Sequence, residues 1–516
     1  MRLNSKAYHI VYNAIYDVRD VTLSRHKKLA GSILLLTTFA FTAISTSFGL
    51  QSASSISATG MINYWPRVDI TVNVSNVIGV NNLSLGSNLD WQWKLFKDRL
   101  VLRQLAKDAG FKLIRVFDFR STSPRLMPCI YWNESTKTGT WDWTQVDALT
   151  QAIFSVGAEP LFCLGWAYYA GDVHRFIPSG MAINPVTQLP YPDSYAAYAA
   201  GWVKHFKQLG LPVRFYEIMN EPYFYFGWNG ENMTRLGYFV EFWNAVARAM
   251  RQENPDVLLS HDAINQKRVL DYWISYGDDV DFIDFHKYDS GVIGQFTDEE
   301  MFNRAERIHF ETTTSFYGVT EARQRWFDSR GKWLLAINSE SNYNSAWETG
   351  TDPKIQQMAG AVWLALVLRM GILKGLDYNL YYDFSSSRSW EEQNKPSGGW
   401  GFGMVNSDNN QPWYPYYVHK MIGSNLGLGD EIVETKSTSG HIRTLAWMHN
   451  GKLMILLICR VIEPRIVGFQ SIAGQFNLIW IDATIPYASP ELQEATINGG
   501  DQIKLNGYTV MLLKET

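Results

Sequence analysis

The segment VRFYEIMNEP, residues 213–222, contains the strand that best indicates the fold class. Its apolar part, Val213–Met219, has the length and composition of a buried strand. The strand ends in the polar triplet NEP (residues 220–222), and a pattern with helical period follows at Leu236–Asn254. A buried strand that ends in polar residues and is followed by a helix is typical of the parallel sheets of α/β proteins.

Similar units recur on both sides of this segment. The eight apolar runs are Val77–Asn81, Leu113–Phe119, Glu159–Leu164, Val213–Met219, Val257–His261, Phe282–Phe285, Leu334–Ile337 and Tyr378–Tyr382. Helical patterns lie between or after them, at Trp91–Ala109, Ser194–Leu209, Leu236–Asn254, Ile355–Met370 and Tyr414–Leu426. Eight strand–helix units in one pass predict an α/β fold, a (β/α)₈ TIM barrel, which we place at residues 69–427. A doubly wound open sheet is the alternative, but no glycine-rich phosphate loop follows the first run.

The pattern changes after Gly427. Short strands with alternating side chains follow, at Ile432–Glu434, His441–Met448, Leu453–Cys459, Phe476–Trp480 and Tyr508–Leu513. Because no segment with helical period separates them, residues 428–516 are predicted to form a small C-terminal β-sandwich domain. The early run Asp69–Val74 is a candidate further strand of this domain.

The composition narrows the possible classes of protein. The chain has 516 residues with 46 Lys and Arg against 50 Asp and Glu, so its formal net charge is −4. Hydrophobic residues make up 46%, which supports a large core and excludes a disordered chain. The absence of a long basic run argues against nucleic acid as a partner. The cysteines Cys129, Cys163 and Cys459 fit neither a disulfide framework nor a zinc motif.

The N-terminal part of the chain has a membrane signal. Residues 29–50 contain no charged side chain and are long enough to span a bilayer. Basic residues stand just before them, and the next cation is Arg67. We therefore expect residues 1–28 in the cytoplasm, a transmembrane signal anchor at 29–50, a linker at 51–68, and the rest at the extracellular face of the membrane. A cleaved signal peptide and a secreted protein are the alternative.

Two glutamates follow strands that lie across the mouth of such a barrel. Glu221 comes after the fourth apolar run and Glu340 after the seventh. Working residues of these barrels lie at the carboxyl ends of the strands. Two facing carboxylates are what glycoside hydrolysis needs, one as a proton donor with a raised pKa and the other as an ionised nucleophile. A separation of ~5–5.5 Å would give a retaining mechanism.

Further residues at strand ends could bind substrate. Arg115 lies in the second run and could hydrogen-bond the nucleophile, or only pair with Asp118. Trp166, Trp390 and Trp400 fall in long strand-end loops, where indoles either stack on sugars or pack the loop.

The sequence resembles the clan A glycoside hydrolases, and most of all the β-xylosidase/α-L-iduronidase family and the related cellulase family. The resemblance rests on Phe215–Pro222, on Asp281–Tyr288, on the second glutamate and on the closing β-rich domain. It implies that Glu221 is the acid/base and Glu340 the nucleophile, and it implies no cofactor.

The same resemblance assigns roles to three further residues. Asn220 would hydrogen-bond the sugar 2-hydroxyl, and His286 and Tyr288 would orient the nucleophile and line the subsite of the cleaved sugar. The sequence differs from many members of the resembled family at two places. Ser339 precedes Glu340 where many relatives have threonine, and Tyr381–Phe384 stands where relatives have a tryptophan on strand eight.

A metal enzyme is the rival chemistry. Alternation along a strand would put Asp284 and His286 on one side, but two ligands do not make a catalytic metal site, so no metal is expected. The sequence therefore predicts a retaining glycoside hydrolase that cleaves β-linked poly- or oligosaccharides such as cellulose, xylan or mannan. A non-catalytic cell-surface carbohydrate-binding protein on a barrel scaffold is the competing hypothesis. Endo or exo action stays open.

Overall fold

The computed structural model describes residues 65–90, 92–117, 126–165, 177–396, 399–470 and 472–516. The chain divides into two units, Met1–Trp65 and Pro66–Thr516, and the second contains nearly all of these residues. The expected anchor at residues 29–50 and the candidate Trp166 lie outside the described residues. Across the ranges given above, no helix is long and apolar enough to cross a bilayer.

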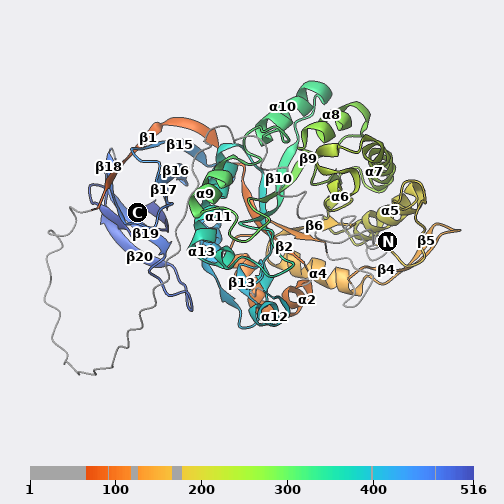
Figure 1. Ribbon diagram of the computed structural model, residues 1–516, viewed down its shortest axis with the longest axis horizontal. Helices are drawn as coiled ribbons and strands as arrows, with labels where there is room; N and C mark the ends of the chain where they lie inside the picture. Colours follow the sequence, from red (N-terminus) through yellow and green to blue (C-terminus); the bar gives the residue numbers. More distant parts are fainter. Residues whose placement is uncertain (1–64, 91, 118–125, 166–176, 397–398, 471) are drawn as a thin grey trace, which may run out of the picture. The chain divides into compact units, whose positions relative to one another are not determined.

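The centre of the second unit is a barrel of eight parallel strands (Figure 1). They are β2 (Ser84–Leu89), β3 (Leu113–Val116), β6 (Glu159–Cys163), β7 (Phe215–Glu217), β8 (Leu258–Ser260), β9 (Phe282–Tyr288), β10 (Leu335–Asn342) and β11 (Tyr378–Tyr381). Their order is β8-β7-β6-β3-β2-β11-β10-β9, and the Asp281 backbone N donates to Leu259 O at 2.8 Å, where β8 meets β9. The barrel is nearly closed, and the TIM-barrel prediction is confirmed.

The first barrel strand is not the predicted one. The run Val77–Asn81 was expected there, but Val77 pairs with Val433 in another sheet, and β2 begins only at Ser84. The sequence of β2, SLGSNL, is too rich in small polar residues to stand out as an apolar run. Gly86 has a structural reason, because a Cβ there would lie 1.9 Å from the carbonyl oxygen of Leu113 on the neighbouring strand.

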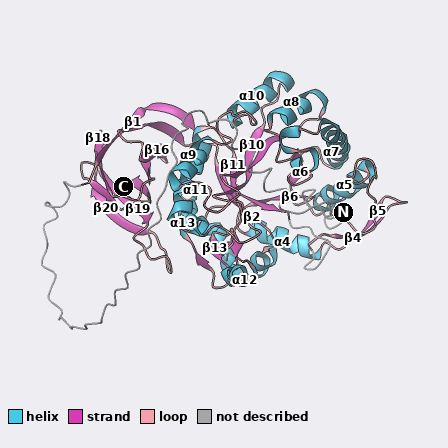
Figure 2. Ribbon diagram, viewed as in Figure 1, coloured by secondary structure: helices cyan, strands magenta, loops and turns pink. Residues whose placement is uncertain are grey.

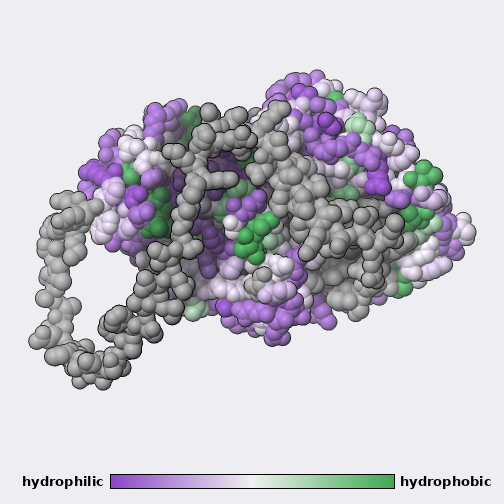
Figure 3. Space-filling view, in the orientation of Figure 1, coloured by the Kyte–Doolittle hydropathy of each residue, from purple (hydrophilic) through white to green (hydrophobic). Residues whose placement is uncertain are grey.

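Helices cover the outside of the barrel, as the cyan ribbons of Figure 2 show. They are α2 (Trp93–Asp98), α3 (Leu100–Asp108), α4 (Thr144–Ser155), α5 (Pro192–Gln208), α7 (Met233–Glu253), α8 (Lys267–Tyr276), α9 (Asp298–Arg307), α10 (Val319–Arg330), α11 (Met358–Leu373) and α13 (Tyr414–Gly423). On the face shown in Figure 3, hydrophilic residues cover the region of α10, as its sequence VTEARQRWFDSR leads one to expect. By contrast, α11 is buried almost all round.

Short helices, turns and strands lie in the loops at the carboxyl ends of the barrel strands. They are the hairpin β4 (Cys129–Asn133) and β5 (Thr138–Trp141), the turns α6 (Tyr223–Phe226), η4 (Trp228–Gly230) and η5 (Pro353–Gln356), the helix α12 (Arg388–Asn394), and the small sheet β12 (Ser385–Ser386), β13 (Val405–Asn406) and β14 (Gln411–Pro412). Most of them belong to the loops after β3, β7, β10 and β11, which is where a TIM barrel places its functional loops.

The C-terminal domain is one mixed sheet of nine strands, in the order β20-β19-β22-β17-β16-β15-β1-β18-β21. Its strands are β1 (Arg67–Val80), β15 (Glu431–Ser437), β16 (Ile442–His449), β17 (Lys452–Cys459), β18 (Arg465–Gln470), β19 (Gln475–Asp482), β20 (Gln493–Asn498), β21 (Ile503–Leu505) and β22 (Thr509–Glu515). β1 pairs antiparallel with β15 and parallel with β18. The candidate run Asp69–Val74 therefore does join this domain.

The predicted β-sandwich is wrong, and the packing of β17 shows why. Ile455 and Leu457 point into a core formed by the nine strands alone. Leu456 and Ile458 point the other way, into the core that the barrel helices share. The nine strands form one sheet that encloses its own core as a half-barrel, and α11, which contacts β17 and β22, covers the other face of that sheet. The apolar run of β17 indicates a strand buried on both faces but not what covers each face.

Candidate active site

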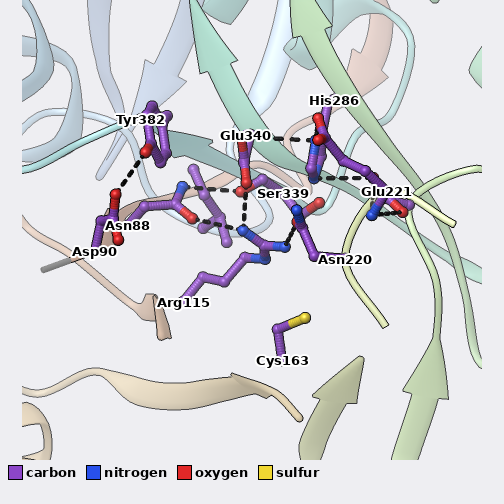
Figure 4. A network of polar contacts seen from close by, with 12 residues as sticks. Asn88, Asp90, Arg115, Cys163, Asn220, Glu221, His286, Ser339, Glu340 and Tyr382 are labelled. Carbon is purple, nitrogen blue, oxygen red and sulfur yellow. Dashed lines mark hydrogen bonds and ion pairs between the residues drawn. The ribbon is translucent and has the colours of Figure 1, made fainter. Parts of the chain in front are cut away.

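The predicted carboxylates and most of the predicted binding residues meet at the carboxyl end of the barrel (Figure 4). Arg115 lies on β3, His286 and Tyr288 on β9, and Glu340 on β10, while Glu221 comes just after β7. Hydrogen bonds or ion pairs connect all of them with Asn220. The contacts around each residue show what it can do.

Arg115 is fully buried and has acceptors on all sides. It donates to Glu340 Oε1 at 2.6 Å, to Glu217 Oε2 at 2.7 Å and to Asn220 Oδ1 at 2.5 Å. Burial lowers the pKa of Arg115, but Glu217 and Glu340 outweigh it and hold that pKa well above its usual value. Arg115 thus stays charged and fixes the nucleophile candidate, whereas its alternative partner Asp118 is outside the described residues.

Both oxygens of Glu340 have a hydrogen-bond donor. Arg115 donates to Oε1, and the Tyr288 hydroxyl donates to Oε2 at 2.6 Å. The residue is 5% exposed, so it is almost fully buried at the carboxyl end of its strand. A carboxylate that donors hold from two sides at this end of the barrel is suited to act as a nucleophile.

Glu221 has a backbone conformation that is rare for a residue with a side chain, with φ of +48°. Its backbone N donates to Asp262 Oδ1 at 2.9 Å. Its side chain reaches the Nδ1 atom of His286, 3.1 Å from Oε1. Burial raises the pKa of Glu221, but the hydrogen bond and charge of His286 outweigh it, so this pKa lies below its usual value. The expected raised pKa of the proton donor is therefore not found at Glu221.

His286 lies between three carboxylates. Its Nδ1 is 3.1 Å from Glu221 Oε1 and 3.6 Å from Glu340 Oε2, and its Nε2 is 3.3 Å from Asp262 Oδ2. Burial lowers the pKa of His286, but Glu340, Asp262 and Glu221 together raise it to about 10. The resemblance implies that His286 orients the nucleophile, whereas in the structure its nearest carboxylate oxygen belongs to Glu221.

The contacts of His286 also limit the distance between the two candidate carboxylates. Glu221 Oε1 and Glu340 Oε2 cannot be farther apart than the sum of their distances to Nδ1, 3.1 and 3.6 Å. That sum lies at the lower end of the ~6.5–9.5 Å range of inverting glycosidases, and any bend at the nitrogen brings the oxygens closer. The bound also includes the ~5–5.5 Å separation of retaining glycosidases.

Among the described residues, Glu221, Asp262 and His286 are the group whose spacing could hold a metal ion. Both ring nitrogens of His286 face carboxylate oxygens, however, and the raised pKa keeps a proton on each nitrogen. A protonated imidazole has no lone pair for a metal. The predicted partner Asp284 is also fully buried, and burial, together with Glu217 and Asp262, raises its pKa well above the usual range. The donor set therefore favours an ion-pair network over a metal centre.

The two described tryptophan candidates lie in the loop after β11. Trp400 stacks on Tyr487 with ring centroids 4.8 Å apart, and its backbone N donates to Thr351 Oγ1. Trp390 lies in α12 and is 41% exposed. Packing of the loop thus accounts for Trp400, while Trp390 is half-exposed and has the Lys395 ammonium over its ring.

Sequence reasoning missed several residues that border Glu340. Asn88 Nδ2 donates to Ser339 O at 2.9 Å, and the Tyr382 hydroxyl donates to Asp90 Oδ2 at 2.8 Å. Asn88 and Asp90 were missed because β2 was placed too early in the sequence. Tyr382 stands where the resemblance expects tryptophan, and its ring lies 6.2 Å from that of Tyr288. The position was noted, but its hydroxyl contact could not be foreseen.

The sequence matches no protein-family model and no curated protein. Solved structures do match. A monomeric β-xylosidase from Caulobacter crescentus has a TM-score of 0.58 and 15% identity, covering 87% of this chain and 99% of its own. An α-L-arabinofuranosidase from Thermotoga maritima has a TM-score of 0.59 and 12% identity, covering 87% and 99%. The fold is that of the clan A glycoside hydrolases. Its likeness extends to a family 30 endoxylanase from Clostridium papyrosolvens, with a TM-score of 0.54, 12% identity, and coverage of 87% and 100%.

The clan A fold was the one that the sequence motifs predicted. At 12–16% identity the likeness concerns the fold, so the chemistry of the site rests on its own residues.

Proposed function

We propose that this protein is a retaining glycoside hydrolase that cleaves β-linked poly- or oligosaccharides by double displacement. The observation that carries the proposal is the pair Glu221 and Glu340, which both lie against Nδ1 of His286. The clan A fold supports it, because that fold brings the ends of β7 and β10 to one mouth.

In the first step Glu340 attacks the anomeric carbon while Glu221 gives a proton to the leaving oxygen. The glycosidic bond breaks, and a covalent glycosyl–Glu340 ester forms. His286 lowers the pKa of Glu221 and lies 3.1 Å from it, so in this mechanism Nδ1 of His286 passes its proton to Glu221. In the second step Glu221 takes a proton from water, the water oxygen bonds to the anomeric carbon, and the ester bond to Glu340 breaks and frees the sugar. The proton on Glu221 then returns to His286.

The substrate class is proposed from the loops around the site and from the similar proteins. Those are a xylosidase, an endoxylanase and an arabinofuranosidase by name. Long loops follow β3, β6, β7, β10 and β11, and such loops suit a cleft for a glycan such as cellulose, xylan or mannan. We also propose a place at the extracellular face of the membrane, or secretion, on the strength of the uncharged residues 29–50. Protease protection of intact cells would test the location.

The test is hydrolysis by the full-length protein in detergent of β-glucans, xylan, mannan and aryl glycosides. Activity on any of these that is lost in Glu221→Gln and in Glu340→Gln would support the proposal. Asp256→Asn is a matched control, because Asp256 is an exposed acid near the start of β8, at the opposite end of the barrel. Binding of a glycan without turnover by the wild type would favour the carbohydrate-binding hypothesis instead.

A further inference from the structure

Three arginines surround one glutamate where helices of the barrel meet the C-terminal sheet (Figure 1). Glu306 lies on α9, Arg369 on α11, Arg443 on β16, and Arg460 directly after β17. Glu306 Oε1 accepts from Arg443 Nε at 2.7 Å and from Arg369 Nη1 at 3.3 Å. Its other oxygen, Oε2, accepts from Arg460 Nη1 at 2.8 Å. We call these four residues the arginine cluster.

The charges of the arginine cluster do not balance. Three guanidinium groups face one carboxylate, which leaves a formal charge of +2. The charge of Glu299 also acts on Arg460, but a positive excess remains when it is counted. The side chain of Arg460 is only 6% exposed, and a charge that is withdrawn from water needs a partner of opposite sign. The protein thus supplies too few anions for this group of cations.

A comparison with Arg115 shows the same imbalance. Burial lowers the pKa of Arg115, but the two carboxylates in contact with it hold that pKa well above its usual value. In the arginine cluster, burial and the charge of Arg443 lower the pKa of Arg369 and of Arg460, and Glu306 does not offset them. A further anion at the cluster would supply the negative charge that Arg115 already has.

The arginine cluster also has hydrogen-bond donors that the protein does not use. Arg443 donates through Nε to Glu306 and through Nη1 to Gly440 O. Arg369 donates through Nε to Thr444 O and through Nη1 to Glu306. Among the described residues the Nη2 nitrogens of these two arginines have no acceptor, and neither nitrogen is shut off from solvent. Arg443 is 30% exposed, the most of the four side chains, so an anion can reach the cluster from its side.

We propose that the arginine cluster binds a tetrahedral oxyanion, a phosphate or sulfate group. A phosphate group carries about two negative charges near neutral pH, which matches the excess charge of the cluster. Its oxygens accept from guanidinium N–H groups in pairs, the geometry in which arginine binds phosphate. A free ion and an ester on a sugar present the same oxygens. The inference is independent of the proposed hydrolysis, because the cluster lies on α9, α11 and the C-terminal sheet and not on β7 or β10.

Calorimetric titration of the full-length protein in detergent with inorganic phosphate, and then with sulfate, tests the site at constant ionic strength. Two charge-assisted hydrogen bonds correspond to a Kd of about 1 mM. Arg443→Gln removes one charge and the most exposed donors, so it should weaken binding by about tenfold or more. Arg248→Gln is the matched control and should change nothing, because Arg248 is exposed and pairs with a carboxylate of its own, Asp278. No saturation by about 10 mM, or equal affinity of the wild type and Arg443→Gln, overturns the site.

Glu306→Gln separates an anion site from ion pairs that only hold the helices against the sheet. Glutamine has nearly the same shape but leaves three arginines without their carboxylate, so this variant should bind phosphate about tenfold more tightly than the wild type. Its melting temperature should be lower than that of the wild type without phosphate and should rise more when phosphate is added. Phosphate also stabilises proteins in general. A rise of the same size in the wild type, Glu306→Gln and Arg443→Gln therefore overturns the proposal.

A comparison of two ligands identifies the source of the anion. Glucose 6-phosphate presents the phosphate oxygens on a sugar, and inorganic phosphate presents them alone. Tighter binding of the ester assigns the site to a phosphorylated sugar, whereas tighter binding of the inorganic ion assigns it to free phosphate. Either result supports the anion site. Binding of neither overturns it, whether or not the protein hydrolyses a glycan.

Discussion

Glu340 lies within a strand, whereas Glu221 lies just beyond one, and their surroundings differ accordingly. Glu340 accepts hydrogen bonds from Arg115 and Tyr288. Glu221 has left-handed backbone and contacts Asp262 through its amide and His286 through its side chain. A nucleophile has to keep its charge and its place, while an acid/base has to exchange a proton. The two environments match these two needs.

The largest expected effect comes from removing Glu340, the proposed nucleophile. Replacement Glu340→Gly removes the nucleophile, so hydrolysis should fall by about 10⁴-fold or more. Azide should then restore turnover and give a glycosyl azide of inverted anomeric configuration, which NMR can identify. An azide product of retained configuration would exchange the roles of the two glutamates.

Glu221→Ala should have a smaller effect that depends on the leaving group. Loss of the proton donor should lower kcat/KM on a polysaccharide by about 10²–10⁴-fold. Aryl glycosides with acidic phenols leave without protonation and should lose much less in the glycosylation step. A series of aryl glycosides with graded phenol pKa values measures how strongly kcat/KM depends on the pKa of the leaving phenol. A uniform loss across the series would contradict an acid/base role for Glu221.

Asp262→Asn sharpens the comparison further, because Asn keeps an acceptor for the backbone N of Glu221 but cannot ionise next to His286. Burial raises the pKa of Asp262 to about 8, so its negative charge faces His286 only above that pH. The pKa of His286, about 10 in the wild type, should fall in the variant. The alkaline limb of the pH–rate profile should move to lower pH, with little change at pH 6, where Asp262 already holds its proton. An unchanged alkaline limb would show that Asp262 does not set the charge of His286.

The smallest expected effect is on stability. The folded pKa of His286 lies above its unfolded value of ~6.5, so the charged ring stabilises the fold below that pH. This contribution decreases as the pH rises through about 10. In urea unfolding, the wild type should thus lose its advantage over His286→Gln between pH 6.5 and 10. A difference in unfolding free energy that stays constant over this range would contradict the raised pKa.

The parts of the fold and site that the sequence predicted all depend on apolar runs that mark the positions of strands. Glu221 and Glu340 each follow a clear apolar run, so strand position alone brought them to one mouth. Asp90 and Asn88 were not predicted, because β2 is rich in serine and glycine and lacks the apolar run of a buried strand. The proximity of His286 to Glu221 depends on side-chain directions across neighbouring strands, which periodicity does not specify. The sequence also does not show which elements pack against each face of a strand that is buried on both faces, such as β17.

Strand β1 has a consequence for how the chain is made. Arg67–Val80 pairs with β15, which starts at Glu431, and with β18, which starts at Arg465. On the ribosome, the first described strand therefore emerges long before its partners, and the whole barrel is synthesised in between. Until then its edges are unpaired, and an unpaired edge invites association with other chains. Chains that stop before β15 would keep this edge unpaired, so β1 can complete its pairing only after residues 431–470 have been made.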